Sequence, residues 1–103
     1  MKVVFSPLAR RHLKDLRRYI AERSSTRVAN TYVERIVRYC GEFDTFPHRG
    51  HARDDLAAGL RTVGFGGRVT IAFFVTSQAV DIAGIYYGGR RFEANFDEGP
   101  SQT

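Results

Sequence analysis

Cysteine and long apolar runs are scarce in this 103-residue sequence, and acidic residues are fewer than basic ones. The single cysteine, Cys40, excludes an internal disulfide, and its place in an apolar helical phase predicts a buried small hydrophobe in a reducing compartment. No segment approaches the ~18 consecutive apolar residues of a membrane span, and the N-terminal residues lack the long apolar region of a secretory signal. We therefore expect a soluble cytoplasmic protein that is not processed.

Basic residues outnumber acidic ones, with sixteen Lys and Arg against eleven Asp and Glu, a formal net charge of +5. The excess lies in residues 1–50, which carry eleven basic and five acidic side chains, whereas residues 51–103 carry five and six. Such a balance favours a polyanion or an acidic protein as partner. The length and the apolar content of 43% suit one domain with one modest core.

Three segments near the C-terminus show the period-two alternation of strands: residues 60–65, 68–76 and 79–87. The connections between them, Gly66-Gly67 and Ser77-Gln78, are too short for a parallel crossover. The three segments therefore predict an antiparallel meander.

Upstream of the meander the pattern changes to one short strand and two helices. Residues 2–5 form an apolar run that ends at Ser6-Pro7, where serine can cap a helix and proline can take its first position. Apolar residues then recur at helical spacing up to Ile20, and again, after Ser24-Ser25-Thr26, up to Phe43. The second helix should end before Phe46-Pro47, and residues 46–58 read as a polar connection without a period.

These elements predict an α+β domain over residues 1–96, followed by a disordered tail at residues 97–103. The expected order is a short N-terminal strand, a helical hairpin and a three-stranded antiparallel meander. The hairpin should cover one face of the sheet and leave the other face open.

Arginines and tyrosines along the meander are the strongest candidates for a binding surface. Guanidinium groups bind phosphates and carboxylates in a fork, and tyrosine rings stack on bases, so the set suits contact with RNA or an anionic peptide. Ordinary solvent-facing arginines are the alternative. The candidate residues are Arg61, Arg68, Tyr86, Tyr87, Arg90 and Arg91.

A basic run in the first helix has two interpretations, nucleic-acid binding or a solvated face of an amphipathic helix, and the second is the commoner. The run comprises Arg10, Arg11, Lys14, Arg17 and Arg18.

His48 and His51 lie near Asp54 and Asp55, but a structural metal site would need further soft ligands, and only Cys40 is available. The two histidines are more often solvated loop residues, although imidazole can act as an acid or a base near neutrality. The glycines of residues 64–67 precede a strand, so they predict a turn and not a phosphate cradle. We expect no metal and no cofactor.

Three segments together resemble the RelE/ParE superfamily of toxins from bacterial type II toxin–antitoxin systems, and the ParE branch most closely: VVFSPLARRHLKDLRRYIAERS, FPHRGHARDDLAAGLR and RVTIAFFVTSQAVDIAGIYYGGRRFE. The resemblance covers about residues 2–93. Its most specific parts are Phe5-Ser6-Pro7, Tyr19-Ile20-Ala21, Phe46-Pro47 with Gly50, and Gly59-Leu60-Arg61.

The resemblance implies a growth-inhibiting toxin that forms a hetero-oligomer with a cognate antitoxin encoded beside it, without a membrane partner. Members like ParE are associated with poisoning of DNA gyrase, the target we expect here, whereas members like RelE cut mRNA on the ribosome. A non-toxic relative kept as an antitoxin-binding module is a third alternative. The residues expected to bind the target or the antitoxin are Arg61, Arg68, Tyr86, Tyr87, Arg90, Arg91 and Phe92.

The RNA-cutting members use basic residues on the sheet, commonly with a C-terminal tyrosine or a histidine. In this chain Arg61, Arg68 and Arg90 fall near such positions, with His48 and His51 as the available histidines. Phe96 stands near the place where the tyrosine would be, and phenylalanine cannot exchange a proton. The sheet arginines thus have no evident proton carrier beside them, which favours inhibition by binding over catalysis.

Overall fold

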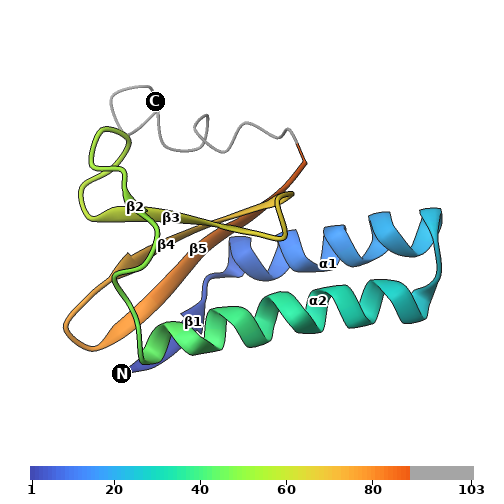
Figure 1. Ribbon diagram of the computed structural model, residues 1–103, viewed down its shortest axis with the longest axis horizontal. Helices are drawn as coiled ribbons and strands as arrows, with labels where there is room; N and C mark the ends of the chain where they lie inside the picture. The colour runs from blue at the N-terminus through green and yellow to red at the C-terminus, as the bar shows by residue number, and fades with distance from the viewer. Residues whose placement is uncertain (89–103) are drawn as a thin grey trace.

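The computed structural model describes residues 1–88, in which two helices lie along one face of a twisted sheet (Figure 1). No helix in this part of the chain is long and apolar enough to cross a membrane. The elements are β1 (Lys2–Phe5), α1 (Pro7–Arg23), α2 (Thr26–Gly41), the 3-10 turn η1 (Glu42–Asp44), β2 (His51–Ala52), β3 (Leu60–Phe65), β4 (Val69–Val75) and β5 (Ala79–Tyr87).

Both helices begin where a serine can cap them. Ser6 precedes Pro7, and its Oγ accepts a hydrogen bond from the backbone N–H of Ala9 at 3.0 Å. The same hydroxyl donates to the carbonyl of Ala83 at 3.0 Å, which ties the start of α1 to β5. Ser25 caps α2 in the same way, through the N–H of Val28 at 3.1 Å. The predicted strand-to-helix switch and helical hairpin are therefore confirmed.

The sheet has the strand order β1-β5-β4-β3-β2. β1 pairs in parallel with β5, and the remaining pairs are antiparallel, so the predicted meander is confirmed. Gly66 and Gly67, with φ of 61° and 74°, make the turn between β3 and β4. The connection at residues 46–58 was expected to lack regular structure, but it contains β2. A strand of two residues is too short to show any period.

Apolar side chains are buried on both faces of the sheet. On the helix side, Phe43 and Phe73 pack ring against ring at 4.8 Å in the main core. On the far side, Leu60, Ala72 and Tyr86 are buried beneath the loop that follows β2. The expectation that this face stays open is therefore wrong in part. The residues of β3 and β4 that point to this side are also apolar, and burial removes them from water.

Cys40 is fully buried on α2, as predicted, and burial raises the pKa of its thiol to about 12 from a usual value of 9.0. Only the thiolate reacts with alkylating reagents, so a rise of about three units lowers the reactive fraction roughly a thousandfold at pH 8. We expect iodoacetamide to label Cys40 roughly a thousandfold more slowly in the native protein than in urea. Mass spectrometry of timed samples measures this ratio, and rapid native labelling would contradict it.

Candidate functional site

The sheet residues expected to form one binding surface lie in three separate places. Arg61 on β3 lies opposite Phe73 on β4. Phe73 is five residues beyond Arg68, so the two arginines are about 16 Å apart along the sheet at the rise of a strand. Tyr86 is only 5% exposed on the far face of the sheet, whereas Tyr87 packs against the core on the helix face. Of this set, the structure brings together Arg68 and Tyr87. Arg90, Arg91 and Phe92 lie outside the described residues.

Arg61 holds the connection between α2 and β2. Its Nε donates to the carbonyl of Arg49 at 3.0 Å, and its Nη2 donates to the carbonyls of His48 at 2.9 Å and Gly50 at 3.3 Å. A guanidinium that donates to three successive carbonyls fixes a loop that has no regular structure of its own. This role in positioning the loop accounts for an arginine in a strand.

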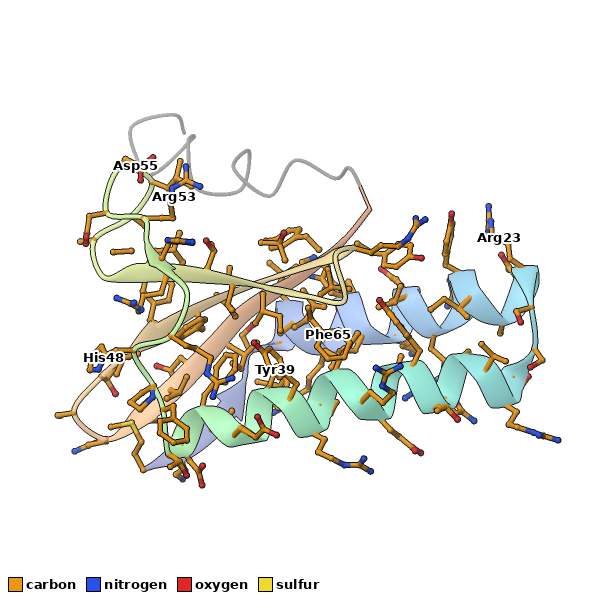
Figure 2. The ribbon with its side chains drawn as sticks, in the orientation of Figure 1. Arg23, Tyr39, His48, Arg53, Asp55 and Phe65 are labelled. Carbon is orange, nitrogen blue, oxygen red and sulfur yellow. The ribbon has the colours of Figure 1, made fainter. Side chains whose placement is uncertain are left out.

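The loop acids and histidines are dispersed. Asp54 accepts from the N–H of Gly59 at 2.8 Å, and Asp55 pairs with Arg53 at 3.0 Å, which lowers the pKa of that carboxyl (Figure 2). His48 and His51 are exposed. Within residues 1–88 no three or more His, Cys, Asp or Glu side chains gather where they could hold a metal ion.

A pocket of about 240 Å³ opens between α1 and the end of β5. It combines an imidazole, a carboxylate, a guanidinium and two phenols in one concave place, where several polar groups can converge on a ligand. The lining residues are His12, Asp15, Leu16, Tyr19, Arg68, Ile85, Tyr87 and Gly88.

His12 stands at the free edge of β5, where its Nδ1 accepts a hydrogen bond from the backbone N–H of Ile85 at 3.0 Å. A nitrogen that accepts carries no proton, so the proton of the neutral ring is assigned to Nε2. The ring also lies 4.8 Å from that of Tyr86. The expectation that the sheet arginines lack a nearby proton carrier is therefore wrong for Arg68, which lines the same pocket as His12.

His12, Asp15 and Tyr19 were missed because each is an unremarkable residue in a helix. A signal was present, since spacings of three and four place them on one side of α1, beside the apolar stripe. What the sequence does not reveal is that the edge of β5 runs past this side of the helix.

Aromatic rings form the wall of the pocket towards the helical hairpin. The ring of Tyr87 lies 5.6 Å from that of Tyr19 and 6.2 Å from that of Tyr32. Arg23 stacks over Tyr19 at 3.7 Å from the ring centroid. These tyrosine rings provide apolar surfaces and Arg68 a fixed positive charge, which together suit an anionic ligand with apolar parts.

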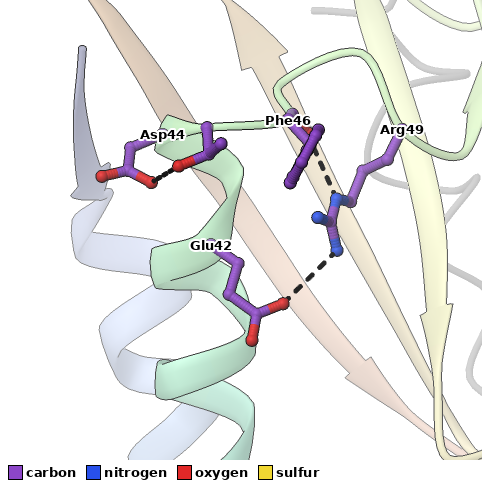
Figure 3. A network of polar contacts seen from close by, with 5 residues as sticks. Glu42, Asp44, Phe46 and Arg49 are labelled. Atoms are coloured by element: carbon purple, nitrogen blue, oxygen red, sulfur yellow. Dashed lines mark hydrogen bonds and ion pairs between the residues drawn. The ribbon is translucent and has the colours of Figure 1, made fainter.

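A second surface runs along α2, where arginines lie over aromatic rings. Arg49 is 4.8 Å from the ring of Phe43 and 5.9 Å from that of Phe46, and it pairs loosely with Glu42 at 3.9 Å (Figure 3). Phe46 is 63% exposed, an unusual position for a large ring. Arg35 lies over Phe65 in the same manner, farther along α2. An exposed ring among arginines is typical of a protein-binding surface.

Comparison with known proteins identifies the family. The sequence model described as "ParE toxin of type II toxin-antitoxin system, parDE" matches residues 3–92. Among solved structures, a chain of the "Chromosomal ParDE TA system from P. aeruginosa" has the same fold, with a TM-score of 0.75 and 18% sequence identity. That alignment covers 85% of this chain and 96% of the other. None of the curated proteins compared with the chain matches it. A family match over nearly the whole length, on a fold with the same order of elements, means that this chain belongs to the ParE toxin family of type II toxin–antitoxin systems.

Proposed function

We propose that this chain inhibits bacterial growth by binding DNA gyrase, and that a cognate antitoxin neutralises it. The observation that carries the proposal is the ParE-family match across residues 3–92. The absence of a tyrosine at Phe96, noted in the sequence, further supports inhibition by binding. Replication would then stop because gyrase is held on DNA.

The pocket beside α1 is the proposed contact for gyrase. Arg68 is exposed at its rim, and Tyr19 and Tyr87 supply the rings on which an apolar group of the target can pack. A charged rim around aromatic anchors is the usual composition of an energetically important contact.

The surface along α2 is the proposed contact for the antitoxin. Val28 and Phe46 are exposed there, and Arg35 and Arg38 lie between them. An acidic amphipathic segment would cover the apolar residues and pair with the cations, so complex formation should have a salt-sensitive association rate.

Two charge reversals should separate these surfaces. We expect Arg68→Glu to weaken inhibition of gyrase supercoiling at least tenfold while antitoxin affinity stays within threefold. Arg38→Glu, at an exposed arginine of α2, should do the opposite. Supercoiling assays with purified gyrase and titrations with the neighbouring gene product measure both effects. Expression of the wild-type chain without growth arrest, or arrest with gyrase fully active, would contradict the proposal.

A ribosome-dependent endoribonuclease is the second candidate, and the observation that favours it is the shared pocket of His12 and Arg68. Imidazole can transfer the protons that RNA cleavage requires, and a guanidinium can stabilise charge on the phosphate. His12→Asn tests this reading, since asparagine can still accept from Ile85 but cannot transfer a proton. Codon-specific cleavage by purified toxin on translating ribosomes, lost in this variant, would replace gyrase binding with catalysis as the function.

A further inference from the structure

One side of α1 carries a stripe of basic side chains, all exposed. With 3.6 residues per turn, the stripe is about 120° wide, and at 1.5 Å per residue it is about 12 Å long. Ion pairs in residues 1–88 join Arg49 to Glu42 and Arg53 to Asp55, so no carboxylate in that part of the chain pairs with the stripe. This cationic stripe consists of Arg10, Arg11, Lys14, Arg17 and Arg18.

The fold does not need these charges. Lys14 has a like charge four residues away on either side, at Arg10 and Arg18, and each such pair destabilises a helix by about 0.2–0.5 kcal/mol. The buried side of α1 comes from Ala9, Leu13 and other apolar residues, and uncharged glutamine forms helix about as well as lysine or arginine. Asp15 and Glu22 lie four residues after Arg11 and Arg18 and offset this cost, so the stripe as a whole adds no helix stability. A concentration of charge that the helix does not need suggests an external partner.

The composition of the stripe argues against a protein partner. Protein interfaces have an apolar core, but none of the exposed large apolar side chains lies within the stripe. Those of α1, Leu8 and Tyr19, lie beside the stripe and not within it, about 60–80° farther around the helix. Single-stranded nucleic acid is also a poor match, because its binding sites stack bases on aromatic rings and the stripe has none.

The charge density matches that of a nucleic-acid duplex. Five cations over about 12 Å amount to one per ~2.4 Å, and duplex DNA carries one negative charge per ~1.7 Å of its axis. We propose that α1 binds the phosphate backbone of duplex DNA through the cationic stripe, without reading its sequence. This binding is a property of the toxin alone and does not require gyrase, so it extends the proposed function and can fail independently of it.

The test is fluorescence anisotropy with the full chain and a labelled 20-base-pair DNA duplex at several salt concentrations. Sequence-independent binding through about four phosphates predicts micromolar affinity at 50 mM salt and a loss of about a hundredfold at 200 mM, because each contact contributes ~0.9 to the slope of log K against log salt. The triple substitution Arg10→Gln, Lys14→Gln and Arg17→Gln should lower that slope by about 2–3 and the affinity at 50 mM by at least tenfold.

The matched control removes the same charge from α2 by the substitutions Arg27→Gln, Arg35→Gln and Arg38→Gln, all at exposed helical positions. It should retain DNA affinity within threefold, and circular dichroism should show both variants folded. Equal losses in the two variants, tighter binding of a single strand of the same length, or equal competition by poly-glutamate would each overturn the proposal. Supercoiling assays are read separately, since gyrase inhibition without DNA binding would refute this inference alone.

Discussion

Replacing Arg61 with alanine is expected to lower the free energy of unfolding by about 2–4 kcal/mol, because three backbone carbonyls lose a charged donor at once. Each hydrogen bond to a charged group contributes about 1.5–3 kcal/mol, and the exposure of this half-buried side chain reduces the total. The connection between α2 and β2 should become mobile, and β2 should separate from β3. Urea denaturation measures the free energy, and hydrogen exchange of the amides at residues 48–52 reports the local opening.

Arg68→Ala is the matched control for this prediction, since Arg68 is also an arginine of the meander but is exposed and lies in the turn between β3 and β4, away from residues 48–50. Its effect on the free energy of unfolding should stay within about 0.5 kcal/mol. Equal stability losses in the two variants would contradict the assignment of Arg61 to the loop.

The second large effect is expected at Gly50. Its φ of +73° is one that alanine adopts only at a cost of about 1–2 kcal/mol. A Cβ there would also meet the carbonyl oxygen of Thr62 and lie 2.9 Å from Cβ of Val63, which adds an overpacking cost of about 1–3 kcal/mol. We expect Gly50→Ala to lower the free energy of unfolding by about 2–5 kcal/mol in urea denaturation.

Gly67 offers a matched control, because its φ is +74° and a Cβ added there meets nothing within 4 Å. Gly67→Ala should therefore cost only the conformational term of about 1–2 kcal/mol. The difference between the two variants isolates the contact with β3. An equal loss in free energy of unfolding for Gly50→Ala and Gly67→Ala would contradict the close contact between Gly50 and Thr62.

The order of the elements was predictable because each begins or ends at a residue with local meaning. Ser6-Pro7 combines a cap with a first helical position, and Gly66-Gly67 permits a tight turn whatever surrounds it. These signals depend on the backbone of a few neighbouring residues, so they can be recognised without knowledge of tertiary contacts. β2 lacks such a signal, and it exists only because the partner strand β3 is present to pair with it.

The candidate site was less predictable, because its residues come from elements that meet only in the folded chain. Arg61 lies in β3 and Arg68 in the turn that follows it, yet one holds a loop and the other borders a pocket. The sequence alone could have placed Tyr86 and Tyr87 on opposite sides of the sheet, since successive residues of a strand face opposite sides. The place of His12 in the site could not be predicted, because it depends on the position of the β5 edge.

Both outer strands of the sheet are short, which has a consequence for solubility. β1 covers β5 only as far as Ile82, and beyond it Ser6 donates to the carbonyl of Ala83 while His12 accepts from the N–H of Ile85. At the opposite edge β2 has two residues. Open strand edges are where sheets of separate molecules join, and side chains that occupy the edge groups obstruct such joining. Loss of the Ser6 or His12 hydrogen bond would therefore expose a template for aggregation, and yield of soluble protein would fall before the folded state became unstable.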